Sequence, residues 1–395
     1  MIVVGAGVVG SSTAFHLARA GSRVVVFDKA GEVCAGMSAR SSALVRMHYT
    51  FAPEAALAWK SLDYFTHWEE IVGRDRARRG CGFVKTGCAI IVGPPNVHKL
   101  RANVAMLRAL GVDTHLVEPP EMRKLEPAIN LDDVALAAYE PQSGYADPVA
   151  TTLSLAEAAE RLGAKFLLGT PIAALDVASG RAHGVIDAAG NRHHACAVCV
   201  VAGPWTDRLL APAGASIGIR SERAQIAFFS RPLTLRHCGC IDTISGSYFR
   251  PHGADLTLAG LGDVKAEYEP DPDGFREDND ADFVTEVAER LAHRMPAMEG
   301  AGYVRGHAGI YDVSPDARAV MGGVPGVERL FAAAGFSGTG FKTAPAVGAA
   351  MAELILTGRA STVDLRPFGF ERLREARFIR GEHEYVMGAN FGHKL

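Results

Sequence analysis

The chain opens with MIVVGAGVVG (residues 1–10), which places a G-x-G-x-x-G fingerprint at Gly5, Gly7 and Gly10. An apolar run directly before Gly5 reads as the end of a buried strand. In a dinucleotide-binding unit, the first glycine permits the tight turn and the second lets the backbone approach a pyrophosphate. The third lets the following helix pack closely on the strand. The stretch therefore predicts a strand, a glycine turn and a helix built to hold a dinucleotide.

The residues that follow complete this unit. Residues 8–20 have helical spacing, and residues 23–27 form a second apolar run that ends at Asp28. The amide groups at a helix N-terminus face the phosphates, and an acid about 20 residues further on accepts from ribose hydroxyls. We expect Asp28 to take that role. The further contacts expected from this unit are Val8, Val9 and Lys29.

Composition limits the class of protein. The chain has 395 residues, of which 48% are hydrophobic and 22% charged, with a net charge of −3. This length favours two domains, and the near-neutral charge gives no reason to expect nucleic acid as a partner. No apolar run is long enough to span a bilayer, and no signal peptide precedes the first strand, so a cytoplasmic enzyme is expected.

The seven cysteines give no metal signature. Cys196 and Cys199 form a C-x-x-C, but it lies in a strand-like run whose alternation points the two side chains to opposite faces. A second pair with zinc spacing is missing from the sequence. We expect reduced, structural cysteines and no metal.

A second candidate binding segment is GMSARSSALVRMHY (residues 36–49), just beyond Asp28. It is a loop rich in small hydroxyl residues, which satisfy phosphate or ribose oxygens well near a helix start. A surface helix cap is the alternative interpretation. The candidate cofactor contacts in it are Ser38, Arg40, Ser41 and Ser42.

A third candidate is VCVVAGPWTDRLL (residues 198–210), where a buried strand runs into a turn and a helix. Ligands of open α/β sheets bind at the carboxyl ends of strands, and glycine permits a close approach there. An ordinary strand-to-helix turn would look the same. The candidate contacts are Ala202, Gly203 and Trp205.

The fourth candidate is LFAAAGFSGTGFKTAPAVGAAMAELILTG (residues 330–358), a strand, a glycine loop and a helix with Pro345 in its first turn. The loop aims amide groups and a positive helix end at whatever lies above it. A reduced flavin, which is negative on its pyrimidine side, needs such a partner, whereas a nicotinamide does not. This favours FAD over NAD. The candidate contacts are Gly335, Phe336, Ser337, Gly338, Thr339, Gly340, Phe341 and Lys342.

These segments are far apart in sequence, so they form one site only if the cofactor domain is discontinuous. We expect a Rossmann-like α/β domain from residues 1–82, 141–221 and 305–395. A β-sheet-rich substrate domain would come from residues 83–140 and 222–304, lying over the cofactor as a roof.

Together with GYADP (residues 144–148) and GIYDVSPDARAVMG (residues 309–322), the four motifs resemble the D-amino-acid oxidase superfamily. The resemblance is to its sarcosine oxidase, dimethylglycine dehydrogenase and glycine oxidase group. It implies FAD extended beneath a β-sheet roof, with Gly309 near the flavin. Relatives with covalent flavin carry Cys at the place of Gly309 or His at that of Ala39, so non-covalent FAD is expected here.

The resemblance also implies a substrate site. Arg46 and Lys342 match the residues that hold a substrate carboxylate, which suits a bidentate guanidinium and a point charge. An internal salt bridge for Arg46 and a contact of Lys342 with the flavin C2 carbonyl are the alternatives. Tyr311 matches a tyrosine of the substrate pocket, and Tyr248 is a candidate roof residue, although buried tyrosines in sheets are common.

Other residues bear on the chemistry. The resemblance implies that Thr257 replaces the lysine that activates oxygen in oxidase relatives, with no lysine following it before Lys265. Rapid use of O₂ is therefore in doubt, and a dehydrogenase is open. His48 and His307 are candidate proton acceptors from the substrate, with structural roles as the alternative.

We expect hydride transfer from a small carboxylate-bearing amine to flavin N5, followed by transfer of electrons to O₂ or another acceptor. Three alternatives stay open: oxidation of a 2-hydroxy acid, a flavin subunit of a hetero-oligomeric sarcosine oxidase-like complex, and a non-catalytic FAD scaffold. The charged tail from Phe370 to Leu395 would cover a surface or contact another subunit in a homo- or hetero-oligomer.

Overall fold

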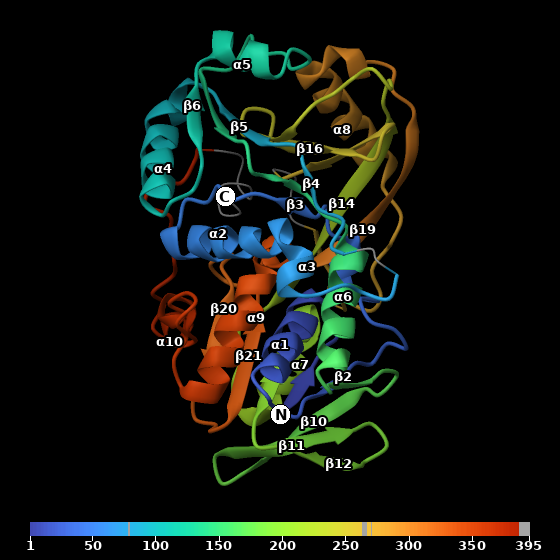
Figure 1. The fold of residues 1–395 in the computed structure, drawn as a ribbon, viewed down its shortest axis with the longest axis vertical. Coiled ribbons are helices and arrows are strands. Elements are labelled where there is room, and N and C mark those ends of the chain that lie inside the picture. The colour runs from blue at the N-terminus through green and yellow to red at the C-terminus, as the bar shows by residue number, and fades with distance from the viewer. Residues whose placement is uncertain (78–79, 263–266, 270, 387–395) are drawn as a thin grey trace.

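The computed structural model describes residues 1–77, 80–262, 267–269 and 271–386. Within them, a six-stranded sheet lies in the lower half of the molecule in the order β20-β21-β13-β1-β2-β9 (Figure 1). Its paired strands are parallel except β20 with β21. Its strands are β1 (Ile2–Val4), β2 (Val25–Phe27), β9 (Lys165–Leu167), β13 (Val198–Val200), β20 (Val320–Gly323) and β21 (Leu330–Ala334).

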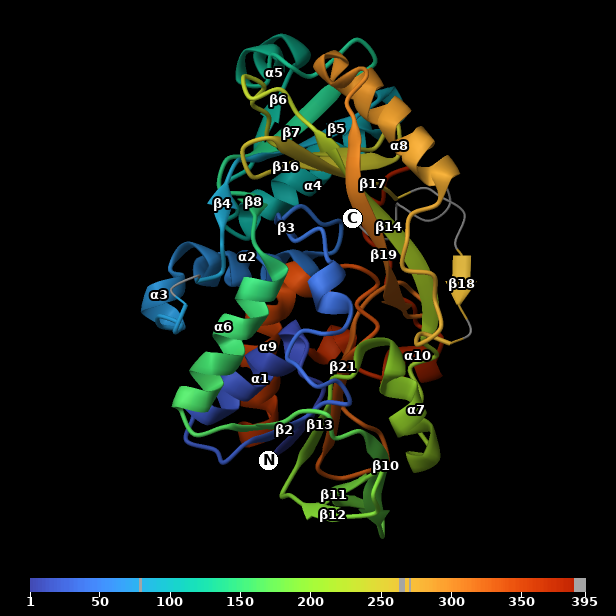
Figure 2. The ribbon, with the colours of Figure 1, turned by 90° about the vertical axis from the view of Figure 1, so that its right-hand side faces the viewer.

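Helices cover one face of this sheet. Alternate residues of each strand point to opposite faces, so each face packs in a core of its own. Val3, Val26 and Cys199 pack in the core that contains α1, α6 and α9, while Ile2 and Val4 pack in the core on the other face. A small antiparallel sheet and α7 lie on that second side (Figure 2). These elements are α1 (Val8–Arg19), α6 (Pro148–Arg161), α9 (Gly340–Thr357), α7 (Thr206–Leu210), β10 (Ile172–Ala178), β11 (Arg181–Asp187) and β12 (Arg192–His194).

The upper half is a second sheet, the roof sheet, whose order is β18-β14-β17-β16-β15-β5-β7-β6, with β19 paired to β14. Helices α4, α5 and α8 lie around it (Figure 1). Its strands are β5 (Cys88–Val92), β6 (His115–Val117), β7 (Leu136–Glu140), β14 (Arg220–Ser230), β15 (Gly239–Asp242), β16 (Ser247–His252), β17 (Leu256–Leu261), β18 (Glu267–Glu269) and β19 (Tyr303–Val313). Its helices are α4 (Val97–Ala109), α5 (Pro119–Leu125) and α8 (Ala281–Arg294).

Shorter elements join the two halves. A small sheet in the order β3-β8-β4 lies between them, and α2 packs against α9. The 3₁₀ turn η1 follows β2 and carries the second candidate segment. These elements are β3 (Leu44–Val45), β4 (Val84–Lys85), β8 (Gly144–Tyr145), α2 (Ala52–Thr66), α3 (Trp68–Ile71), α10 (Glu371–Arg374), and the 3₁₀ turns η1 (Met37–Arg40), η2 (Pro94–Asn96), η3 (Gly203–Trp205), η4 (Ala211–Ala213), η5 (Pro296–Met298) and η6 (Arg366–Phe368).

The glycine turn after β1 is tightly packed. A Cβ on Gly5, whose φ is +118°, would lie 2.5 Å from the Val201 carbonyl oxygen, and a Cβ on Gly10 would lie 1.8 Å from the Gly5 oxygen. Neither position accepts a side chain without backbone movement. The fingerprint therefore forms the turn that the sequence predicts, and the α/β class with a β-rich roof is confirmed.

Two expectations about segment limits differ from the structure. The boundaries drawn at 222 and 305 fall inside β14 and β19, which pair along their lengths, so residues 303–313 lie in the roof sheet. Pro345 is inside α9 rather than in its first turn, because the helix already begins at Gly340. Ser61 of α2 hydrogen bonds the helix backbone on either side of Pro345, since its hydroxyl donates to the Thr343 oxygen and accepts from the Ala346 amide.

Candidate functional site

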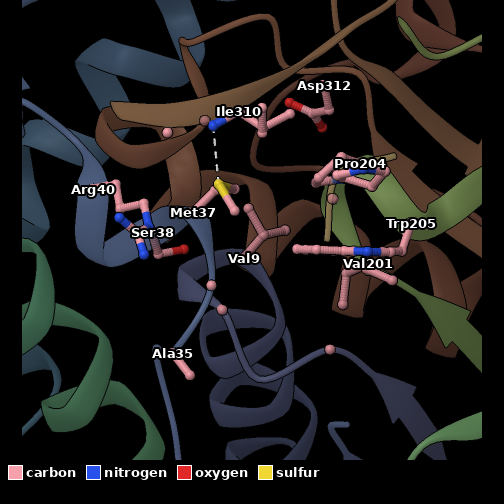
Figure 3. A pocket seen from close by; sticks show the side chains of 18 of the residues that line it. Val9, Ala35, Met37, Ser38, Arg40, Val201, Pro204, Trp205, Ile310 and Asp312 are labelled. Carbon is pink, nitrogen blue, oxygen red and sulfur yellow. Dashed lines mark hydrogen bonds between the residues drawn. The ribbon is translucent and has the colours of Figure 1, made fainter. Parts of the chain in front are cut away.

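A cavity of about 540 Å³ lies at the carboxyl ends of β1, β2, β13 and β21, beneath the roof sheet (Figure 3). Four segments that are distant in sequence meet there, as the four motifs require. The sequence-predicted residues in its wall are Gly5, Gly7, Val8, Val9, Asp28, Lys29, Ser38, Arg40, Ser41, Ser42, Ala202, Gly203, Trp205, Gly309, Tyr311, Phe336, Gly338, Gly340 and Phe341.

Asp28 ties the glycine turn to the end of β2. One carboxylate oxygen accepts from the Ala6 amide at 2.6 Å, and the other accepts from the Ala30 amide at 2.8 Å. Each oxygen keeps a further lone pair on the cavity side for a ribose hydroxyl. Ser38 reaches the same turn, because its hydroxyl oxygen accepts from the Val8 amide at 3.0 Å.

The second glycine loop is held by an acid that sequence reasoning missed. The carboxylate of Asp312 accepts from the Gly335 amide at 2.7 Å, and burial raises the pKa of Asp312 to about 6. The ring of Tyr311 lies flat on this loop, since a Cβ on Gly338 would be 3.0 Å from that ring. The position of Asp312 directly after Tyr311 in a strand, ahead of the loop, was the available signal.

Several predicted cofactor residues support the wall from behind. Gly10 packs against Gly5, and the Ser337 hydroxyl donates to the Gly335 oxygen at 3.1 Å. The Thr339 hydroxyl donates to the Phe336 oxygen at 2.8 Å. These residues shape the two turns whose backbones face the cavity.

The cavity fits FAD. The N-terminal turn of α1 lines it at Val8 and Val9, which is where a diphosphate binds a helix. The start of α9 lines it at Gly340 and Phe341, so a second helix N-terminus faces the same space. One helix start would accommodate the diphosphate and the other the electron-rich edge of a flavin.

Arg46 and Lys342 meet in the structure, although almost the whole chain separates them. Both are buried, with exposed fractions of 5% and 8%, and both face the ring of Tyr49. The Arg46 Cζ is 4.6 Å and the Lys342 Nζ 5.8 Å from the centroid of that ring. Lys342 directly follows the wall residue Phe341 in sequence, but neither cation is itself a residue of the cavity wall.

Burial shapes the charge of this pair. Desolvation, and then the positive charge of Arg46, lower the pKa of Lys342 to about 7. Arg46 also donates from Nη1 to the His48 carbonyl oxygen. Two buried cations held together in this way have a strong electrostatic preference for an anion such as a carboxylate.

The structure gives the two histidines other partners. His48 is fully buried, its Nε2 lies 2.6 Å from the Tyr385 hydroxyl, and burial followed by Arg46 lowers its pKa to about 3. His307 is half-buried, with Nε2 3.3 Å from the Arg40 oxygen, and burial also lowers its pKa. Both rings are therefore neutral near pH 7, and the tail residue Tyr385 packs within its own chain.

Tyr311 and Tyr248 lie side by side on the cavity face of the roof sheet. Tyr311 is in the cavity wall, and its side chain is hydrogen bonded to Tyr248, which is half-buried. Burial, followed by Tyr311, raises the pKa of Tyr248 well above its ordinary value. The pair presents two hydroxyls on the roof side of the glycine loop.

The expectation for Thr257 is wrong. Thr257 pairs with Phe229 in the sheet, and both lie on the face that packs on α8, away from the cavity. Its hydroxyl is 2.9 Å from Nε2 of His237. The cavity face of β17 instead carries Leu258 and Gly260, because register decides which alternate residues face the site. Lys265 lies outside the described residues, as do tail residues 387–395.

Several other residues of the site were not predicted from the sequence. Glu140, at the end of β7, is fully buried near Arg46, where its carboxylate accepts from the Met47 amide and the Ser143 hydroxyl. The only sequence signal for Glu140 was an acid at the end of an apolar run of residues. The further wall residues include Phe27, Ala35, Met37, Thr170, Arg208, Ala224, Ile226, Asp273, Phe275 and Glu277.

One cavity brings together two glycine-rich helix starts, an acid at the end of β2 and a β-sheet roof. This combination defines a flavin-dependent oxidoreductase. The chain belongs to the DAO family, because the family model described as FAD dependent oxidoreductase matches residues 1–354. FAD is accordingly its cofactor.

Relatives support this assignment along nearly the whole chain. The chain is 28% identical to FAD-dependent oxidoreductase domain-containing protein 1 of Bos taurus, over 94% of this chain and 84% of that protein. It is 26% identical to glycine oxidase of Geobacillus kaustophilus, over 94% and 96%. The solved structure of L-proline dehydrogenase from P. horikoshii is similar with a TM-score of 0.86 and 25% identity, over 96% and 98%.

Residues 1–77, 80–262, 267–269 and 271–386 contain neither a candidate membrane span nor a candidate metal-ligand cluster. Within those ranges, no helix has the length and apolar character needed to cross a membrane. The same part of the chain has no group of three or more His, Cys, Asp or Glu side chains placed to hold a metal ion.

Proposed function

We propose that this enzyme oxidises the C–N bond of a small amino acid or N-alkyl amino acid to an imine. Bound FAD supplies the two-electron acceptor: the substrate carbon gives up a hydride to flavin N5, and the amine proton leaves to solvent. Relatives named glycine oxidase and L-proline dehydrogenase support this substrate class. Non-covalent FAD is part of the proposal, since Gly309 in the cavity wall and Ala39 offer no attachment atom.

The observation that carries the proposal is the buried pair Arg46 and Lys342 beside Tyr49. A carboxylate bound by this pair fixes one end of a small substrate, and the guanidinium can hold both oxygens at once. In this proposal Tyr311 and Tyr248 line the substrate site from the roof sheet. Binding at one end is what aligns the reacting carbon over the cofactor, and alignment accounts for much of such catalysis.

We further propose that electrons leave to an acceptor other than O₂. The cavity face of β17 carries Leu258 and Gly260 rather than a lysine. Among the described residues of the cavity wall, Lys29 is the one lysine, and it is paired with Asp273 near the glycine turn. A lysine is therefore missing from the described residues of this strand, and the buried cation of the neighbouring strand β16, Arg250, is engaged by the Ser42 carbonyl oxygen.

The test is anaerobic reduction of the yellow holoenzyme by sarcosine, glycine, proline, dimethylglycine and D- and L-amino acids, followed by flavin absorbance. We expect bleaching by at least one of them. Arg46→Ala and Lys342→Ala should each raise the KM for that acid at least tenfold, whereas exposed Arg101→Ala should leave it unchanged. Unaltered KM values in both variants would contradict the carboxylate role.

The cationic pair would hold a 2-hydroxy acid equally well, so hydroxy acids belong in the same panel. Bleaching by a hydroxy acid and by no amine would establish that alternative. A chain that retains FAD yet is reduced only after a second protein is added would be a flavin subunit.

A further inference from the structure

One segment of the roof half forms the outer side of the cofactor cavity. Residues 271–277 lie between β18 and α8, and Pro272, Asp273, Phe275 and Glu277 line the cavity. Pro272 is buried, while Asp273 and Glu277 are exposed. The segment, here called the acidic wall, thus has the cavity on one side and solvent on the other. In Figure 2, β18 lies beside β14 on the edge of the molecule, above α7.

The acidic wall is tied to the lower half at its first end by ion pairs. Arg208 of α7 donates to Asp271 at 2.6 Å and to Asp273 at 3.0 Å. Lys29, which follows Asp28 at the end of β2, is also paired with Asp273. The Lys29 ammonium lies 3.8 Å from the centroid of the Trp205 ring, so this contact adds a cation–π interaction.

Its second end is fixed by Arg40, from the turn η1. Arg40 donates to Glu277 at 2.7 Å, and its guanidinium carbon lies 5.4 Å from the centroid of Phe275. The Ala308 amide of β19 donates to the Glu277 carbonyl oxygen at 2.6 Å. Three cations that line the cavity, Lys29, Arg40 and Arg208, are therefore all engaged by acids of one segment.

We propose that the acidic wall belongs to the FAD site and retains the bound cofactor by holding the cavity closed on its solvent side. Its acids face cations of the wall rather than the helix start of α1, so they need not repel the diphosphate that binds there. Each exposed ion pair contributes little alone, but cofactor release past this side requires several to break together. Salt screens such pairs, so release should depend on ionic strength.

The test compares FAD release from holoenzyme after dilution, measured as the rise of free-flavin fluorescence. Asp271→Asn with Asp273→Asn should release FAD about tenfold faster than wild type at low salt. High salt should accelerate the wild type towards the variant and change the variant little. The control is Asp364→Asn, which removes an exposed pair with Arg366 away from the cavity and should not alter release.

Arg208→Gln breaks two of the same contacts from the other side and must act in the same direction. It decides the question if the double variant does not fold. Release that is unchanged or slower in the folded variants would overturn the proposal, as would wild-type release independent of salt. These readouts need no substrate, so failure here leaves the proposed reaction standing.

Discussion

Carboxylate binding should weaken as pH rises through about 7, because Lys342 then loses its proton. Burial and the charge of Arg46 lower the pKa of Lys342 from 10.5 to about 7. Below that pH the site holds two cations, and above it only the guanidinium of Arg46 stays charged. Neutral Lys342 offers a carboxylate one weak donor in place of a full positive charge.

The size of the loss in carboxylate affinity follows from the lowered pKa of Lys342. Lowering a pKa from 10.5 to about 7 corresponds to about 5 kcal/mol against the charged ammonium in the empty site. A carboxylate bound beside Lys342 recovers part of this free energy. Above pH 7, binding of the carboxylate is therefore coupled to the uptake of a proton by Lys342. Each pH unit above the pKa of the empty site then costs up to about tenfold in affinity, about 1.4 kcal/mol.

Acetate is the suitable ligand, because it stays ionised across this range and has no amine to titrate. We would titrate holoenzyme with acetate between about pH 6 and about pH 9 and follow the flavin spectrum. Lys342→Met should bind acetate more weakly at the acid end and show little pH dependence. The matched control is Lys60→Met, an exposed lysine on α2.

Two results would refute the reasoning. One is a wild-type affinity for acetate that is constant across this range. The other is a Lys342→Met variant that keeps the wild-type slope, since the titrating group would then be another residue.

Further predictions concern the fold and the cofactor. Stability should rise with pH between about 7 and 10.5, because unfolded Lys342 binds a proton that the folded chain lacks, and Lys342→Met should abolish this rise in denaturant titrations. Glu54→Gln removes the nearer carboxylate partner of the buried Arg318, whose other carboxylate partner, Glu384, lies 3.8 Å away, and should cost about 3–5 kcal/mol of unfolding free energy, against less than 1 kcal/mol for exposed Asp364→Asn; equal losses would contradict a role for burial. Asp28→Ala should weaken FAD binding by about tenfold or more in equilibrium dialysis of the apoprotein, and unaltered affinity would exclude the ribose contact. Gly348→Ala would place a Cβ 2.1 Å from the Ser12 hydroxyl oxygen and should destabilise by 2 kcal/mol or more. Gly163→Ala meets no atom within 4 Å and should cost only about 1–2 kcal/mol for its positive φ, so similar melting curves would refute the close α1–α9 contact.

The turns of the cofactor half could be predicted from the sequence because a few adjacent residues determine each of them. Gly5 and Gly10 are required by a turn that admits no Cβ, and Asp28 follows from its place at the end of β2. The glycine loop before α9 has the same character, because a few adjacent residues set its backbone. Signals of this kind depend on neighbours along the chain, which a sequence displays directly.

Strand register and contacts between distant segments could not be predicted from adjacent residues. Thr257 was assigned to the site by a loose strand alignment, and one residue of register sends its side chain to α8 instead. His48 was expected at the substrate, but Tyr385 from the other end of the chain takes its Nε2. Glu140 lies in no motif, and Asp312 lies in the GIYDVSPDARAVMG stretch without being singled out, because the roles of both acids come from what packs on them.

The sequence by itself determined the dinucleotide turn, the preference for FAD and the order of segments that meet at the cavity, since each is encoded by adjacent residues. Only the tertiary structure decided that Arg46 and Lys342 share one buried site, and that Asp273 lines the cofactor cavity. The physical reason is that burial and charge depend on distances between segments. Those distances are fixed only when the roof sheet packs on the cofactor half.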